Sequence, residues 1–263
     1  MAFLQVNYYS QVLGMDRHMN VILPELSDHN PSWTADMLQD IPVLYLLHGM
    51  SGDQDIWQRR TSIERLVRQT IVAVVMPSTD LAWYTNTTYG LNYFDALAEE
   101  LPNKVASLFP QLSTKREKNF VAGLSMGGYG AFKLGLGTTR FSYAASLSGA
   151  LVGDPQFGTI PDETPHDYWT GIFGDLDKFV GSDNDLLALA KKNTHKPQLY
   201  AWIGEQDYLK PTNDDFIPKL RDLNYDITFE TAPGKHEWYY WDKKIERVLE
   251  WLPINYVPEE RLS

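Results

Sequence analysis

Residues 123–127 read Gly-Leu-Ser-Met-Gly, a G-x-S-x-G pattern that stands between two segments of different character. The apolar run 119–124 is typical of a short buried strand, and 126–138 is typical of a helix. Ser125 is therefore predicted to occupy a sharp strand-to-helix turn, which holds up a serine hydroxyl for attack on a carbonyl carbon. Gly123 and Gly127 would leave room for neighbouring backbone to pass close to that turn. The pattern thus favours an α/β fold.

The rest of the chain alternates strand-like with helix-like segments. Strands are expected at 3–9, 17–23, 41–47, 71–76, 119–124, 142–147, 198–203 and 226–231. The alternation predicts a mostly parallel sheet with helices on both faces. A helical stretch around 94–108 should be kinked or broken at Pro102. Residues 149–190, rich in glycine, proline and aromatic residues, interrupt the rhythm, and we expect them to form a lid or cap within one domain, 1–263.

Composition narrows the classes of function. A chain of 263 residues with a formal net charge of -11 is a poor partner for nucleic acid or an anionic membrane. The absence of cysteine removes disulfides, thiolate metal sites and cysteine nucleophiles. No segment resembles a signal peptide or a membrane span. We expect a cytoplasmic protein that needs no cofactor or metal, binds a small-molecule substrate and associates as a homo-oligomer.

A serine hydroxyl needs a base to take its proton, and that base needs an acid to orient it. His236 follows the last expected strand, so it should lie at the carboxyl edge of the sheet beside Ser125. The acid should come between serine and histidine in chain order. Asp207 directly follows the strand 198–203 and is our choice, with Glu205 the nearest rival.

An anionic tetrahedral intermediate needs two backbone donors aimed at its oxygen. Met126, the residue after the serine, should supply one N–H group. The other should come from the loop 48–52, where we choose Met50 and keep Gly49 as the alternative. His48 in this loop is expected to be a structural hydrogen-bonding residue and not a base. Trp83 and Trp238 are candidates for lining the pocket.

Four motifs together resemble one family. They are His48-Gly49, Gly-Leu-Ser-Met-Gly-Gly at 123–128, Gly-Glu-Gln-Asp at 204–207 and Gly-Lys-His-Glu-Trp at 234–238. This set resembles the putative-esterase (esterase D-like) family of α/β-hydrolases, and it is most similar to bacterial tributyrin esterases. The resemblance implies an α/β-hydrolase fold whose eight-stranded sheet has antiparallel first strands. It also implies the triad and the oxyanion-hole amides already chosen.

The hypothesis is therefore a serine carboxylesterase that hydrolyses short-chain acyl esters, acetyl to butyryl, through an acyl-enzyme on Ser125. The aromatic residues of the lid, Phe157, Tyr168, Trp169 and Phe173, would keep the acyl pocket small. An S-formylglutathione hydrolase and a carbohydrate acetyl or feruloyl esterase are alternatives within the family. A non-catalytic binding scaffold is the alternative from another class.

Overall fold

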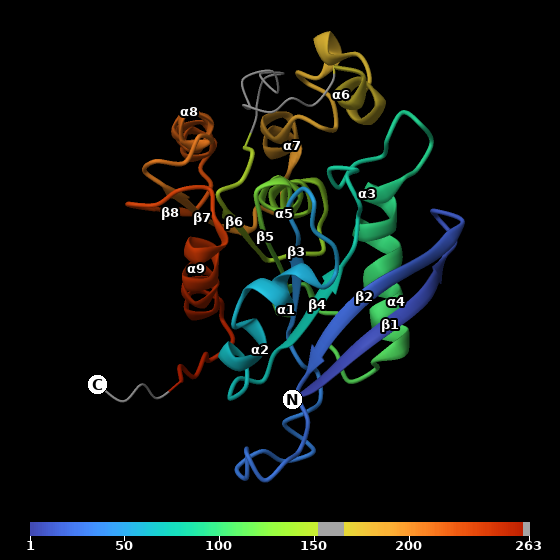
Figure 1. The fold of residues 1–263 in the computed structure, drawn as a ribbon, viewed down its shortest axis with the longest axis vertical. Helices are drawn as coiled ribbons and strands as arrows, with labels where there is room; N and C mark the ends of the chain where they lie inside the picture. Colours follow the sequence, from blue (N-terminus) through green and yellow to red (C-terminus); the bar gives the residue numbers. More distant parts are fainter. Residues whose placement is uncertain (152–165, 260–263) are drawn as a thin grey trace.

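The computed structural model describes residues 1–151 and 166–259, and their strands form one sheet (Figure 1). The strands are β1 (Ala2–Ser10), β2 (Met15–Leu23), β3 (Val43–Leu47), β4 (Ala73–Pro77), β5 (Asn119–Leu124), β6 (Tyr143–Leu147), β7 (Gln198–Gly204) and β8 (Ile227–Ala232). Their order across the sheet is β1-β2-β4-β3-β5-β6-β7-β8. β2 pairs antiparallel with both β1 and β4, and every other pairing is parallel. The predicted eight-stranded, mostly parallel sheet with antiparallel first strands is confirmed.

Helices cover both faces of the sheet, as predicted. One face packs against α1 (Ile56–Arg60), α2 (Ile63–Leu66) and α9 (Trp238–Trp251). The other packs against α4 (Leu101–Leu108), α5 (Met126–Gly137), α7 (Leu186–Lys192) and α8 (Lys210–Asp222). β3, β4 and β5 are buried along their whole length because they lie between the two helical layers. This burial explains why their sequences are continuous apolar runs.

The helical stretch after β4 differs from the prediction in one respect. It consists of α3 (Tyr93–Asp95), a π-helical segment η1 (Ala96–Glu100) and then α4. Pro102 lies within the first turn of α4, and α4 continues from η1 without a break in the helical backbone. The irregularity therefore precedes Pro102 and is a widened turn, not a break at the proline.

The described part of the predicted lid packs onto the body of the protein. Residues 166–190 contain α6 (His166–Phe173), the short 3-10 helix η4 (Leu176–Lys178) and the start of α7. The side chains of Trp169, Phe173 and Phe179 are buried in the same core as the helices beside β5. Figure 1 shows α6 above α7 at one end of the molecule. Phe157, which was also expected to belong to the lid, falls outside the described residues.

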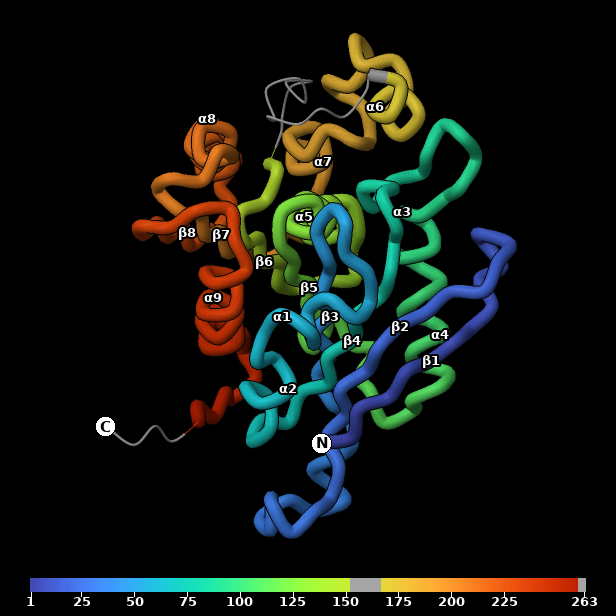
Figure 2. Tube along the Cα trace, viewed as in Figure 1, coloured from blue at the N-terminus to red at the C-terminus, as the bar shows by residue number. Residues whose placement is uncertain are grey.

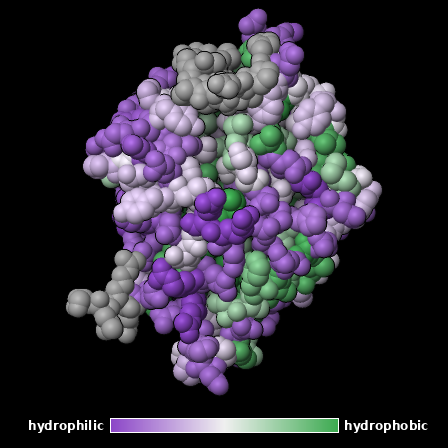
Figure 3. Space-filling model, viewed as in Figure 1, coloured by the Kyte–Doolittle hydropathy of each residue, from purple (hydrophilic) through white to green (hydrophobic). Residues whose placement is uncertain are grey.

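The segment between β2 and β3 loops away from the sheet near the N-terminus (Figure 2). Most of the face seen in Figure 3 is hydrophilic, and its hydrophobic residues gather on the side of the β1–β2 hairpin. Within the described part of the chain, no helix combines the length and the apolar character needed to cross a membrane.

Candidate active site

The turn between β5 and α5 places Ser125 in a strained backbone conformation. Its φ of 53° and ψ of -119° are unusual for a residue with a side chain, and such strain is typical of functional turns. A Cβ on Gly123 would lie 2.3 Å from the carbonyl oxygen of Gly127, and a Cβ on Gly127 would lie 2.5 Å from that of His48. Both positions therefore require glycine, as the motif predicts, because backbone crowds them.

The structure brings the three predicted catalytic side chains together at the carboxyl edge of the sheet. Nε2 of His236 lies 3.0 Å from Oγ of Ser125, and its Nδ1 lies 3.0 and 3.1 Å from the two carboxylate oxygens of Asp207. Ser125 follows β5, Asp207 follows β7, and His236 lies between β8 and α9. The rival acid, Glu205, is exposed, and its backbone N–H bonds to Ala232.

Burial and hydrogen bonding hold the carboxylate of Asp207 in place. The side chain of Asp207 is fully buried, whereas that of His236 retains 15% of its exposure. Oδ1 of Asp207 also accepts the backbone N–H of Leu209 at 2.9 Å. An ionised carboxylate held this way accepts Nδ1–H from the imidazole and leaves Nε2 free to accept the serine proton.

Two aromatic rings contact the imidazole of His236. Trp241 contacts it edge-on with ring centroids 4.9 Å apart, and Tyr208 lies 4.6 Å away at a tilt. The indole N–H of Trp241 donates to Oγ of Ser148, which anchors that ring. Sequence reasoning missed both neighbours. Tyr208 had a usable signal, since it directly follows Asp207, but Trp241 became visible only once α9 was placed.

The two residues chosen for the oxyanion hole occupy different surroundings. Met50 lines the cavity at Ser125 together with Gly49. The side chain of Met126 is buried in the core, so only its backbone can serve the site. Met126 is the first residue of α5, and N–H groups in the first turn of a helix have no intrahelical acceptor. A Cβ on Gly49 would lie 3.3 Å from Cβ of Ser125, so the loop runs directly beside the serine.

His48 makes only structural hydrogen bonds within the described chain, in the manner expected. Its ring is completely buried, its Nδ1 lies 2.7 Å from the carbonyl oxygen of Gly49, and its Nε2 accepts the backbone N–H of Thr79 at 3.0 Å. Because Thr79 N–H can only donate, Nε2 must be unprotonated. Burial lowers the pKa of His48 and so favours this neutral form.

A cavity of about 510 Å³ opens beside Ser125. Both predicted lining residues, Trp83 and Trp238, contribute to its wall, with Ile56, Tyr208 and Trp241. Among the described residues of 149–190, only Ala150 lines it. The described aromatic residues of the expected lid do not line the cavity: Trp169 and Phe173 pack against Trp83, and the hydroxyl of Tyr168 accepts the indole N–H of Trp83 at 3.0 Å. They support the cavity wall and do not cover the serine.

A larger hollow of about 910 Å³ lies elsewhere, between α5, α7 and the segment 94–99. It contains none of the three predicted catalytic residues, and its floor is formed in part by the buried Lys133. We place the chemistry in the smaller cavity, because Ser125 and His236 line it and His236 is hydrogen-bonded to Asp207. Over the same residues, no group of three or more His, Asp or Glu side chains could hold a metal ion.

Comparison with known proteins gives consistent matches over almost the entire chain. The model of the family described as Putative esterase matches residues 10–252. An acetyl esterase of Caldicellulosiruptor saccharolyticus is 33% identical, covering 96% of this chain and 98% of its own length. Two solved structures from Staphylococcus aureus are each 36% identical and cover 95% of this chain and 98% of their own. They are the fluorophosphonate-binding serine hydrolase FphF, with a TM-score of 0.83, and the S-formylglutathione hydrolase FrmB, with 0.82.

Proposed function

We propose that this chain, a carboxylic ester hydrolase belonging to the Putative esterase family, hydrolyses short-chain acyl esters through an acyl-enzyme on Ser125. The observation that carries the proposal is the continuous hydrogen-bonded chain from Ser125 through His236 to the buried Asp207. A binding scaffold without catalysis would have no need of this arrangement or of the strained serine turn.

The first half of the reaction forms the acyl-enzyme. Oγ of Ser125 attacks the ester carbonyl carbon while Nε2 of His236 takes the hydroxyl proton. The negative charge that develops on the carbonyl oxygen is stabilised by the backbone N–H groups of Met126 and Met50. Asp207 stabilises the imidazolium that forms. The tetrahedral intermediate then collapses, the bond to the alcohol oxygen breaks, and His236 gives its proton to the leaving alcohol.

The second half regenerates the enzyme. Water enters as the alcohol leaves, His236 takes one of its protons, and the hydroxide oxygen attacks the acyl carbon. The oxyanion of the second tetrahedral intermediate accepts hydrogen bonds from the same two backbone N–H groups. Its collapse breaks the bond to Oγ of Ser125, which recovers a proton from His236, and the free acid departs.

The cavity supports a preference for acyl groups from acetyl to butyryl. One part of its wall is Trp83, which is 1% exposed and packs against Trp169 and Phe173, neither of which lines the cavity. Each methylene that is buried gains about 0.8 kcal/mol, but pushing into a well-packed wall costs roughly 1–3 kcal/mol. Rings packed this way resist displacement, so longer chains would find no room behind Trp83.

Substitution of Ser125 by alanine tests the function directly. We expect Ser125→Ala to lower kcat for p-nitrophenyl acetate by about 10⁵-fold or more, because the three residues act as a unit. A fluorophosphonate probe should label the wild type and not this variant. The matched control is Ser142→Ala, a buried serine that precedes β6 at the opposite end of the strands. Full turnover by Ser125→Ala would contradict the proposal.

S-formylglutathione is a second candidate substrate, favoured by the 36% identity to FrmB over nearly the full chain. The chemistry is the same, with a thiolate as leaving group in place of an alkoxide. A panel of p-nitrophenyl esters, acetylated sugars and S-formylglutathione, compared by kcat/KM, separates the candidates. A value for S-formylglutathione well above that for every oxygen ester would replace the short-chain ester assignment.

A further inference from the structure

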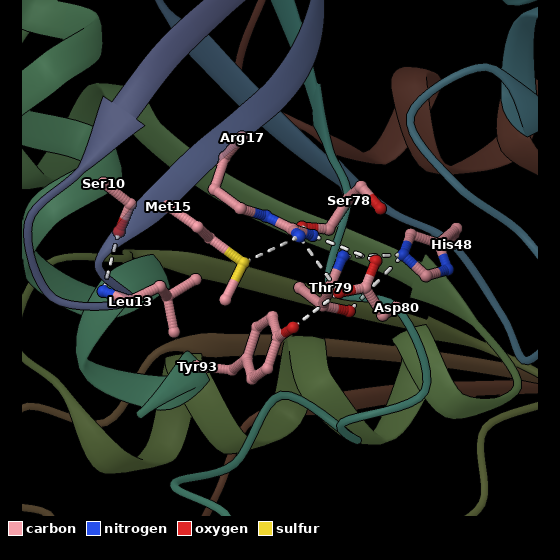
Figure 4. A network of polar contacts seen from close by, with 9 residues as sticks. All are labelled: Ser10, Leu13, Met15, Arg17, His48, Ser78, Thr79, Asp80 and Tyr93. Carbon is pink, nitrogen blue, oxygen red and sulfur yellow. Dashed lines mark hydrogen bonds and ion pairs between the residues drawn. The ribbon is translucent and has the colours of Figure 1, made fainter. Parts of the chain in front are cut away.

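An ion pair between Arg17 and Asp80 lies close to His48, the first residue of the loop 48–52 (Figure 4). The guanidinium is largely buried, whereas the side chain of Asp80 keeps 53% of its exposure. Arg17 of β2 is 8% exposed, and its two terminal nitrogens donate to the two carboxylate oxygens of Asp80 at 3.0 and 3.1 Å. One of them also donates to the carbonyl oxygen of Ser78 at 3.0 Å. The hydroxyl of Tyr93 donates to the same carboxylate. Two side chains from two elements, Arg17 of β2 and Tyr93 of α3, thus fix the backbone at 78–80.

The backbone at this point needs to be fixed. Asp80 has a φ of 51°, in the left-handed region that a residue with a side chain adopts at a cost. Partial burial opposes ionisation, yet the hydrogen bonds from Arg17 and Tyr93 hold the pKa of the Asp80 carboxyl below its ordinary value. The carboxylate is therefore charged at neutral pH, and a bidentate guanidinium pair orients it more tightly than a single contact would.

The neighbouring residue passes this constraint to the loop. Thr79 is completely buried, and its backbone N–H donates to Nε2 of His48 at 3.0 Å. The other ring nitrogen of His48 lies 2.7 Å from the carbonyl oxygen of Gly49. The peptide unit that carries this carbonyl also carries the N–H of Met50. The orientation of the imidazole therefore sets the direction in which the Met50 N–H points.

We propose that Arg17 and Asp80 are positioning residues for the oxyanion hole, acting through Thr79 and His48 on the Met50 amide. The inference rests on the proposed function and on Met50 supplying that donor. Neither Arg17 nor Asp80 lines the cavity beside Ser125. Their loss should consequently weaken stabilisation of the transition state and leave the binding of the ground-state ester unchanged.

The principal variant is Asp80→Asn. It keeps the size of the side chain and tolerates the left-handed backbone, while it removes the charge that Arg17 grips. Arg17→Lys is the second variant, because it keeps a positive charge but lacks the planar fork. Asp40→Asn is the matched control. Asp40 also has a left-handed φ, of 55°, and pairs with Lys115 and Lys118, but it precedes β3 at the opposite end of the strands.

The readouts are kcat and KM for p-nitrophenyl acetate, the inhibition constant of a trifluoromethyl ketone, and Tm. The ketone adds to the serine and places an oxyanion in the hole, so it reports on the donors directly. Removal of one such donor lowers kcat by about 10²–10³-fold, and a misdirected donor should cost about tenfold. We expect Asp80→Asn and Arg17→Lys to show that loss in kcat, with KM within about twofold of the wild-type value. The inhibition constant of the ketone should rise in parallel.

Several outcomes would overturn the inference while the proposed function stands. They are a kcat within about twofold of wild type in both variants, a loss of kcat with unchanged ketone inhibition, or a loss that merely follows the unfolded fraction. An equal loss in Asp40→Asn would also overturn it, because the effect would then be a general consequence of removing an ion pair. A wild-type protein that neither hydrolyses esters nor reacts with a fluorophosphonate overturns the proposed function, and this inference with it.

Discussion

Lys133 is a buried cation in the middle of α5, and its replacement by methionine should stabilise the protein at neutral pH. The residue is 2% exposed, and its Nζ donates to Oγ1 of Thr85 and, at 2.6 Å, to Oδ1 of Asn184. Both acceptors are neutral. Asp95 and Asp183 act on it only from a distance, and burial lowers the pKa of Lys133 from 10.5 to about 7.

The sign and size of the effect follow from this pKa. The unfolded chain keeps the lysine proton up to about pH 10.5, whereas the folded chain loses it above about pH 7. Stability therefore falls as the pH is lowered from 10.5 to 7, and the cost then stays constant at roughly 5 kcal/mol. Methionine fills a similar space without that cost. It loses the hydrogen bonds to Thr85 and Asn184, worth about 1–3 kcal/mol, so Lys133→Met should gain about 2–4 kcal/mol at pH 7.

Chemical unfolding in urea at pH 7, 8, 9 and 10 measures this difference. The advantage of Lys133→Met should shrink as the pH rises and should reverse by about pH 10, where the burial cost has fallen below the worth of the lost hydrogen bonds. Lys192→Met is the matched control, since Lys192 lines the same hollow but has a side chain that is 63% exposed. That change should alter stability by less than about 0.5 kcal/mol. A difference for Lys133→Met that does not vary with pH would refute the reasoning.

Three further predictions concern the site. Asp207→Asn should lower kcat for p-nitrophenyl acetate by about 10⁴-fold with little change in KM, because the imidazole loses the tautomer that accepts the serine proton; a loss below tenfold would favour another acid. Gly127→Ala should lower the free energy of unfolding by about 1–3 kcal/mol, measured in urea, since its Cβ would lie 2.5 Å from two carbonyl oxygens. Hydrolysis of p-nitrophenyl esters should peak between acetyl and butyryl and fall by octanoyl, and a kcat/KM that rises through dodecanoyl would indicate an open groove.

Much of the candidate site could be predicted because its members lie at the ends of strands. Parallel strands bring their carboxyl ends to one edge, so residues that follow β5, β7 and β8 must converge whatever the details of packing. Ser125, Asp207 and His236 are each within a few residues of such an end. The strained turn at Ser125 could also be predicted from adjacent residues, because the flanking glycines indicate that backbone crowds the turn.

Segments shaped by distant contacts were harder to predict. Pro102 indicated an irregular helix, but its form, the widened turn η1 in the five residues before α4, could not be read from the sequence. The aromatic residues at 168–173 were predicted to lie near the site, but the sequence did not indicate that they would pack against Trp83 without lining the cavity. They pack against Trp83, which has a left-handed φ of 52°, and no sequence pattern indicates this conformation for a tryptophan.

The pairing of Arg17 with Asp80 near the loop 48–52 shows why some interactions could not be predicted without a structure. Arg17 and Asp80 are 63 residues apart and belong to different strand ends, so each reads in isolation as an ordinary surface charge. Their pairing depends on β2 lying antiparallel beside β4, in a register where Met19 faces Pro77. That register brings Arg17 level with the turn that follows β4. The antiparallel strands at the edge of the sheet thus have a role beyond extending it: they carry the group that holds the loop beside the nucleophile.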